Sequence, residues 1–379
     1  MKVLQVSPIP INRGGVEKGG VESHVSELSG KLLEEGGEVI FFRNSVTGYK
    51  GKKEDVFYYS SILSLIISAL LGFLKYNSKL SINLPIGKKI KVMAYCHTLS
   101  KISSISRFDV AHIHGLHNLA GFACQILNIP HVFTDHGIGH KQSFHNDREL
   151  ITLNVSKSKI VIAISDESFK NVLDVVGSEI KVKKINNPID IDTNGVSECE
   201  FGFDYIIFNG ISDTWVRKGL SKINDEIDDI LSEIYPMKLL VVCEKKYFSR
   251  LLLDDSSRSN QLVHILPVSR DKMLSMVKGA KFNLAPSIKE GFSIAYLESI
   301  ILGTPVIGFD SNILEMNLLF DTNLNQPFCN NDVNKLAPVV KAMNNEILEG
   351  SVLEIESNPL SWDYSIARFF EVYCKAVNE

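Results

Sequence analysis

Short apolar runs alternate with amphipathic segments along the first half of the chain. Residues 1–7 form an apolar run, residues 21–35 carry apolar side chains at helical spacing before Gly36, and residues 38–43 form a second run. This order predicts a strand, a helix and a strand, the beginning of a parallel α/β unit. Further strands are predicted at 110–114, 131–134 and 160–164. Because ligands collect at the carboxyl ends of parallel strands, the residues after these runs are candidates for a site.

The pattern stops between residues 186 and 195, where turn-forming Asn, Pro, Asp and Gly accumulate, and then begins again. The second half predicts strands at 205–208, 238–242, 262–266 and 282–285, and helices at 220–231 and 270–278. We therefore expect two α/β domains, residues 1–187 and 188–361. Helical periodicity in the last segment predicts a separate helix within 362–379.

An apolar run at 62–74 needs its own interpretation. It is shorter than the roughly 20 residues that a spanning helix needs, so no transmembrane segment is expected. We expect a helix buried in the core of the first domain. The alternative is a membrane-facing helix, because basic residues follow closely. They are Lys75, Lys79, Lys88, Lys89 and Lys91.

Composition narrows the class of protein. A chain of 379 residues with 45% hydrophobic content has room for two domain cores. A net charge of −4 and a pI of about 6.2 provide no broad basic field, which excludes nucleic acid as the expected partner. The six cysteines include no Cys-x-x-Cys pair and indicate reduced thiols in a cytoplasmic setting. The N-terminus lacks the features of a signal peptide, so export is not expected.

The segment 287–298 contains the most informative chemistry. Glu290 and Glu298 are eight positions apart, the first beside a glycine and the second inside an apolar run that predicts a helix. The two carboxylates would share one face, with Glu290 at or just before the helix N-terminus. Backbone N–H groups of Gly291, Phe292 and Ser293 would face an anion, and carboxylates accept hydrogen bonds from sugar hydroxyls. This suits a sugar diphosphate. The alternative is a pair of glutamates on a solvated helix.

Together with the following Leu-Gly-Thr-Pro-Val segment at 302–306, this pattern resembles the donor site of the retaining nucleotide-sugar glycosyltransferases of family 4. The resemblance implies an α/β protein with the GT-B fold, two Rossmann-like domains facing each other across a cleft, with a last helix that crosses back onto the first domain. It also implies that Glu290 holds the hydroxyls of the donor sugar and that Glu298 holds the ribose. Gly291, Phe292 and Ser293 would bind the donor.

A second part of the resemblance lies in segment 208–220. Lys218, followed by Gly219 and Leu220, matches the end of the segment that binds the diphosphate in this family. A cation there stabilises the charge of the leaving group. Ile211 stands where the family usually has an arginine. We expect Arg217 to supply the missing charge. The alternative is that Arg217 is an exposed loop side chain.

Glycines at 14–20 lie between the first predicted strand and helix, where a backbone without side chains can approach a ligand closely. The resemblance places Gly20 beside the donor phosphates. A tight turn at Gly19 is the alternative. His24, inside the following helix, is expected to pack in the core.

Histidines cluster after two of the predicted strands. The resemblance places His136 at the reacting centre, beside the donor sugar and its phosphate, and places His114 and His117 on the acceptor side. His112 is expected to pack within its strand. A metal site would need an established ligand spacing such as His-Glu-x-x-His, which these histidines lack, so we expect none.

The leading hypothesis is a metal-independent retaining hexosyltransferase that moves a sugar from a nucleoside diphosphate, UDP- or GDP-linked, to an acceptor hydroxyl in glycan, polysaccharide or glycolipid synthesis. The resemblance implies that the backbone of 264–268 contacts the base, with a buried strand end as the alternative. A backbone contact leaves uridine, guanosine and adenosine open. A glycan or lipid-linked acceptor and peripheral membrane contact through 62–91, at the inner face of the membrane, are further expectations.

Ile211 motivates the alternative of a catalytically weakened sugar-nucleotide-binding subunit of the same fold. An enzyme that uses a nicotinamide cofactor would need a Gly-x-Gly-x-x-Gly fingerprint, which is absent.

Overall fold

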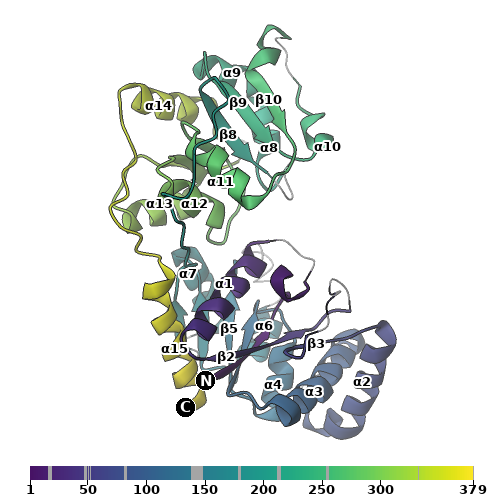
Figure 1. Cartoon of the computed structure of the whole chain (residues 1–379). Coiled ribbons are helices and arrows are strands. Elements are labelled where there is room, and N and C mark those ends of the chain that lie inside the picture. Colours follow the sequence, from purple (N-terminus) through teal and green to yellow (C-terminus); the bar gives the residue numbers. More distant parts are fainter. Residues whose placement is uncertain are drawn as a thin grey trace. The chain divides into compact units, whose positions relative to one another are not determined.

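The chain divides into two compact units, each built on one sheet (Figure 1). The first unit comprises Met1–Pro188 and Trp362–Glu379, and the second comprises Ile189–Ser361. The computed structural model describes residues 1–15, 19–46, 49, 51, 53–80, 83–137, 148–177, 181–210, 215–252, 256–331 and 333–378.

The first unit contains a seven-stranded parallel sheet with the order β3-β2-β1-β4-β5-β6-β7. The chain builds outward from β1 in one direction and then, from β4, in the other, so β1 and β4 flank the point where the strand order reverses. The strands are β1 Lys2–Val6, β2 Glu38–Arg43, β3 Val56–Tyr58, β4 Val110–His114, β5 His131–Asp135, β6 Ile160–Ala163 and β7 Lys181–Lys184. The central strands β4, β5 and β6 are buried along their whole length, as helices on both faces require.

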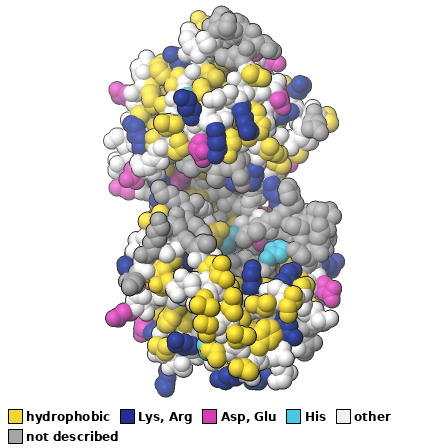
Figure 2. Space-filling view, turned by 90° about the vertical axis from the view of Figure 1, so that its right-hand side faces the viewer, with side chains coloured by type: hydrophobic (Ala, Val, Ile, Leu, Met, Phe, Trp, Pro, Cys, Tyr) yellow, Lys and Arg dark blue, Asp and Glu magenta, His cyan; other side chains and the backbone are white. Residues whose placement is uncertain are grey.

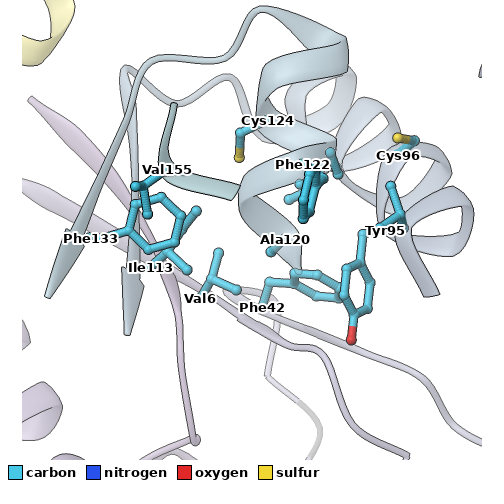
Figure 3. Packing of buried hydrophobic residues seen from close by; sticks show 14 of the residues in the cluster. Val6, Phe42, Tyr95, Cys96, Ile113, Ala120, Phe122, Cys124, Phe133 and Val155 are labelled. Carbon is cyan, nitrogen blue, oxygen red and sulfur yellow. The ribbon is translucent and has the colours of Figure 1, made fainter. Parts of the chain in front are cut away.

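Helices cover both faces of this sheet. They are α1 Gly20–Glu34, α2 Ile62–Tyr76, α3 Ile86–Ser106, α4 Ala120–Leu127, α6 Arg148–Val155, α7 Asp166–Val176 and α15 Trp362–Asn378, with 3-10 turns η1 Ile11–Arg13 and η2 Asn77–Lys79. On one face, Phe42 and Phe133 of the strands pack against Phe122 of α4 and Tyr95 of α3 (Figure 3).

The last helix, α15, belongs to the first unit although it follows the second unit in sequence. Trp362 is buried on the other face of the first sheet, where its Nε1 donates a hydrogen bond to Glu27 of α1 at 2.7 Å. Arg368 donates to the backbone oxygen of Lys184, at 2.5 Å. The return of the last helix to the first unit is what the family resemblance implies.

Helix α2 differs from the expectation. Only Ala69, Gly72 and Tyr76 of its 15 residues are buried, so the prediction of a buried core helix is wrong. The buried residues face α3, and the large aliphatic side chains point to solvent. The helix also extends past the apolar run: Ile62–Lys79, 18 residues with a mean hydropathy of 1.2 and 17% buried, is long and apolar enough to cross a membrane by length and composition.

The second unit contains a six-stranded parallel sheet with the order β10-β9-β8-β11-β12-β13. Its strands are β8 Tyr205–Asn209, β9 Lys238–Val242, β10 Leu262–Ile265, β11 Asn283–Ala285, β12 Val306–Phe309 and β13 Gln326–Phe328. Its helices are α8 Leu220–Asp225, α9 Ile227–Glu233, α10 Lys245–Phe248, α11 Arg270–Lys278, α12 Ile294–Ile301, α13 Asp310–Leu319 and α14 Ala337–Leu348, with η3 Ser256–Gln261. The strand order reverses between β8 and β11, so the loops after these two strands are where a ligand site is expected.

Candidate functional site

The loops that follow β8 and β11 are held against each other in the second unit. The backbone N–H of Ile288 donates to the carbonyl of Arg217 at 2.9 Å. Gly219 has a φ of 85°, and a Cβ added to it would lie 2.0 Å from the carbonyl oxygen of Pro286. Only glycine fits there, because any side chain would meet that backbone and the left-handed φ disfavours other residues. This contact fixes the backbone next to Lys218.

Glu290 is the centre of a charged group at this point. Lys218 Nζ lies 2.5 Å from Glu290 Oε1, and the hydroxyl of Ser287 donates to the same oxygen at 2.9 Å. Arg217 Nη1 lies 3.8 Å from Glu290 Oε2. The side chain of Glu290 is 9% exposed, against 20% for Lys218 and 41% for Arg217, so the ion pair with Lys218 is the less screened of the two. The structure brings the three predicted charges together and adds Ser287, which the sequence analysis missed.

Helix α12 begins after Glu290, not at it. The helix starts at Ile294 with Ser293 as its N-cap residue, so Glu290 lies in the preceding turn and shares no helical face with Glu298. The backbone N–H of Ser293 donates to Asn312 Oδ1 at 3.0 Å. This amide is therefore already bonded within the protein, and a role for Ser293 in donor binding stays a prediction. The corresponding roles of Gly291 and Phe292 stay predictions.

Glu298 lies on α12 and pairs with a residue that the sequence analysis did not name. Arg270 Nε donates to Glu298 Oε1 at 2.7 Å, and the Glu298 side chain is 13% exposed. Burial raises the pKa of Glu298 above its ordinary value, and the nearby Arg270 opposes that rise. Arg270 opens α11, whose N-cap is Ser269, shortly after β10. Ser269 signals the start of a helix in the sequence, but this signal does not point to Glu298.

In the segment 264–268, which is expected beside the base, the side chain of His264 packs against the protein. His264 Nε2 lies 3.0 Å from the carbonyl oxygen of Cys243, and its ring stacks on Phe248 with centroids 4.3 Å apart. Leu266, just beyond β10, is 60% exposed. A role for the backbone here stays a prediction.

In the first unit, His114 and His136 form a hydrogen-bonded pair at the ends of β4 and β5. Nδ1 of His114 lies 2.8 Å from Nε2 of His136, and Nε2 of His114 lies 2.8 Å from Gln5 Oε1. The pKa values of both histidines are lowered well below the ordinary value, first by loss of water around the rings and then by neighbouring imidazoles. Both rings are therefore neutral at neutral pH and bring no charge to a phosphate.

The other histidines around this pair have structural contacts. His112 lies within β4 and binds the Tyr373 hydroxyl at 2.8 Å and Thr134 Oγ1 at 2.7 Å. His24 is 2% exposed and its ring lies 5.2 Å from that of His136. Both predictions of core packing are confirmed. His117 lies in the turn after β4 and is partly buried, and His140 lies outside the described residues. Within the described part of the chain, no three His, Cys, Asp or Glu side chains are grouped to hold a metal ion.

The glycine-rich segment places Gly20 at the first position of α1, where it is exposed. The first amides of an α-helix have no partner within the helix, and the N-terminus of this 15-residue helix therefore has a partial positive charge. Gly19 has a φ of −174°, and an added Cβ would meet nothing within 4 Å among the described residues, so a tight turn does not require glycine there. Residues 16–18 and Ile211 lie outside the described residues.

Comparison with known proteins agrees with this geometry. Residues 18–193 match the model of glycosyltransferase family 4, and residues 204–340 match that of the glycosyl transferases group 1. The chain belongs to glycosyltransferase family 4 and has the GT-B fold of two Rossmann-like units.

Solved structures and a curated relative extend this comparison. Sucrose-phosphate synthase from Thermosynechococcus elongatus has a TM-score of 0.68 at 13% identity, covering 99% of this chain and 98% of that one. HepE from Anabaena, in complex with UDP and glucose, has a TM-score of 0.62 at 14% identity, covering 100% and 95%. One subunit of phosphatidylinositol N-acetylglucosaminyltransferase from Homo sapiens is 26% identical over 300 residues, or 76% of this chain. The chain spans 58% of that relative's length.

Proposed function

We propose that this protein is a retaining, metal-independent hexosyltransferase that moves a sugar from a nucleoside diphosphate to an acceptor hydroxyl. The observation that carries the proposal is the group formed by Glu290, Lys218 and Arg217 where the second sheet reverses its strand order. The two cations match the anionic diphosphate of a sugar diphosphate, and the carboxylate beside them matches the hydroxyls of its sugar.

Lys218 and Arg217 hold the diphosphate and stabilise the charge that develops on it as the sugar leaves. Glu290 accepts hydrogen bonds from the sugar hydroxyls, with one oxygen oriented by Ser287 and Lys218. Glu298 accepts from the ribose, and Arg270 keeps it ionised. Because these groups are positioned before the donor arrives, little reorganisation accompanies the reaction.

His136 is proposed to contact the donor sugar, with His114 as its positioning residue. If His114 Nε2 donates to Gln5 Oε1, its neutral ring accepts at Nδ1 from His136 Nε2–H. This tautomer leaves His136 Nδ1 as an acceptor for a hydroxyl of the substrate. Both nitrogens of His114 are already bonded within the protein, so direct acceptor binding on this side is left to His117.

The donor and acceptor classes are proposed from the relatives. HepE was solved with UDP and with glucose, which supports a UDP-linked donor, with GDP as the other candidate. The name of the human relative refers to a phosphatidylinositol acceptor, which supports a lipid-linked or glycan acceptor in glycan, polysaccharide or glycolipid synthesis. A cytoplasmic enzyme at the inner face of the membrane fits such an acceptor.

A thermal-shift screen followed by a turnover assay tests the proposal. UDP, GDP, ADP and their sugar conjugates are added to the wild type and to Glu290→Gln, because a ligand that binds only the folded protein raises the unfolding temperature. We expect one nucleotide to stabilise both proteins and its sugar conjugate to stabilise the wild type more. Slow donor hydrolysis should then be measurable. Binding without hydrolysis or transfer would favour the weakened, binding-only subunit of the same fold.

A further inference from the structure

The outer face of α2 is a large apolar surface. Its members, which we call the α2 face, are between 42% and 85% exposed: Ile62, Leu63, Ile66, Ile67, Leu70, Leu71 and Leu74. Figure 2 looks onto the side of the molecule that carries α2, where hydrophobic side chains gather into a patch with Lys and Arg side chains beside it. Soluble monomeric proteins rarely expose a contiguous apolar patch of this kind without a binding partner.

The helix cannot turn this face inward. Its inner side is already packed against the core, with Ala69, Gly72 and Tyr76 buried and with Leu65 and Phe73 partly buried beside them. A Cβ added to Gly72 would lie 2.0 Å from the carbonyl oxygen of Met93 on α3, so the two backbones are in close contact. A leucine or isoleucine would not fit in that space. An ordinary amphipathic surface helix has a polar outer face, whereas α2 is apolar on its outer face as well as on its inner one.

The charge around the α2 face has one sign. Residues 56–108 contain no Asp or Glu and seven basic residues, Lys75, Lys79, Lys88, Lys89, Lys91, Lys101 and Arg107. Two of these lie against aromatic rings of α2: Lys89 Nζ is 5.7 Å from the ring centre of Phe73, and Lys75 Nζ is 5.2 Å from that of Tyr76. Such contacts keep the ammonium groups beside the helix.

We propose that the α2 face docks onto the surface of a bilayer that contains anionic lipids, with α2 lying in the plane of the interface. The apolar side chains enter the boundary between headgroups and acyl chains, and the lysines contact lipid phosphates. The close contact of Gly72 with the backbone of α3 keeps α2 packed against α3, which opposes insertion of α2 across the membrane. A second copy of the chain is a poor occupant, because a two-fold contact would bring two basic surfaces together.

Vesicle sedimentation tests the proposal. Wild type should bind vesicles of phosphatidylcholine and phosphatidylglycerol, bind pure phosphatidylcholine weakly, and lose binding as salt rises. Lys88→Gln/Lys89→Gln/Lys91→Gln should weaken binding to anionic vesicles by about 100-fold, at roughly fivefold per basic residue. Leu70→Glu/Leu74→Glu should weaken it by at least about tenfold.

A matched control is Leu318→Glu on α13 of the second unit. Leu318 is 84% exposed and Leu74 is 85% exposed, so the same change is made to an equally accessible leucine. The control should bind vesicles as the wild type does. Thermal unfolding and nucleotide binding of all variants should match the wild type, which separates failure of docking from loss of the fold and from failure of the proposed function.

Insertion has a separate readout. Leu74→Trp should show a blue shift of tryptophan emission and quenching by brominated lipids when anionic vesicles are added, whereas Leu318→Trp should show neither. The proposal is overturned if wild type does not bind anionic vesicles at low salt, if Leu70→Glu/Leu74→Glu binds unchanged, or if Leu74→Trp shows no shift. It is also overturned if ultracentrifugation shows a dimer that Leu70→Glu/Leu74→Glu dissociates and that does not bind vesicles.

Discussion

His114 and His136 stack with their ring planes 17° apart and their ring centroids 5.1 Å apart, and a hydrogen bond joins Nδ1 of the first to Nε2 of the second. The two residues come from the ends of the neighbouring parallel strands β4 and β5. With His136 Nε2–H as the donor, a second proton on His114 would occupy the accepting nitrogen and break that bond, and protonation of both rings would place like charges together. The pair is therefore a neutral unit whose geometry depends on pH.

The first prediction concerns this dependence. The pKa of His24 is lowered from 6.5 to about 4 by burial, and the pKa values of His112, His114 and His136 are also lowered well below 6.5, first by the same cause. Below about pH 6.5 the unfolded chain takes up protons that the folded protein excludes. The free energy of unfolding should be flat above that pH and fall below it, by up to about 1.4 kcal/mol per pH unit for each such histidine. Urea unfolding from pH 7.5 to 5 measures this.

His24→Phe separates one contribution from the rest. No hydrogen-bond partner for either ring nitrogen of His24 is present among the described residues, and the ring packs beside Trp362 and Phe369. Replacement by phenylalanine should raise stability at pH 7 by about 1–3 kcal/mol and reduce the slope below pH 6.5. His97→Phe, at a partly exposed position on α3, should change stability by less than about 0.5 kcal/mol. An unchanged slope in His24→Phe would show that His24 is charged or hydrogen-bonded in the folded protein.

The second prediction ranks the two cations beside Glu290. Lys218→Met should lower kcat by about 100-fold to 1000-fold, because a preorganised charge facing the leaving group is lost in a poorly solvated site. Arg217→Met should cost about tenfold, since Arg217 is more exposed and farther from Glu290. Lys246→Met, at an exposed lysine on α10, serves as the control. Equal rates for Arg217→Met and wild type would refute the idea that Arg217 supplies the charge that Ile211 lacks. A higher rate for Ile211→Arg would show that the wild type binds the diphosphate with one cation too few.

The third prediction concerns Glu298 and pH. Burial raises the pKa of this carboxyl, so nucleotide affinity should begin to fall at a higher pH than for an ordinary glutamate. Arg270→Ala removes the charge that opposes this rise and should move the loss of affinity to still higher pH. Calorimetry across about pH 5 to 8 measures both proteins. Glu298→Gln cannot ionise and supplies the baseline. If nucleotide affinity depends on pH in the same way in the wild type and in Glu298→Gln, Glu298 does not bind the nucleotide.

The fourth prediction tests the contact between the two loops of the second unit. Gly219 and Gly202 both have a left-handed backbone, with φ of 85° and 73°. An added Cβ meets the Pro286 carbonyl only at Gly219 and meets nothing within 4 Å at Gly202. Gly202→Ala should cost about 1–2 kcal/mol of stability for the backbone alone. Gly219→Ala should cost clearly more and should also weaken donor binding. Equal effects of the two substitutions on binding would mean that the loop contact does not position Lys218.

Much of the fold could be predicted because the relevant signals are local. Most strands of both sheets coincide with predicted apolar runs, since strands buried on both faces need apolar side chains throughout. The strands β3, β7, β12 and β13 were not predicted, and β7 is rich in lysine and has no apolar run. The predicted helix 220–231 is two helices, α8 and α9, because Glu226 interrupts it and accepts hydrogen bonds from the amides of Leu336 and Ala337. Those partners lie more than a hundred residues away, beyond any local pattern.

The candidate site shows the same division. Lys218 and Glu290 could be named from their motifs, but their contact depends on two loops meeting at Gly219 and Pro286. The amide of Ser293 donates a hydrogen bond to Asn312 of a different helix, a partner that the local pattern does not show. Arg270 was missed because nothing near it in sequence points to Glu298.

The sequence by itself determined the alternation of strands and helices in two α/β units, the type of chemistry at 287–298 and the family resemblance, because these depend on residue types at short spacing. Only the tertiary structure decided which apolar residues are buried. Helix α2 has the composition of a core helix, yet the close packing of Gly72 on α3 leaves its large side chains exposed. The pairing of His114 with His136 was decided in the same way. Burial and hydrogen bonding depend on which residues are neighbours in space. The periodicity of apolar residues along the chain does not give these neighbours.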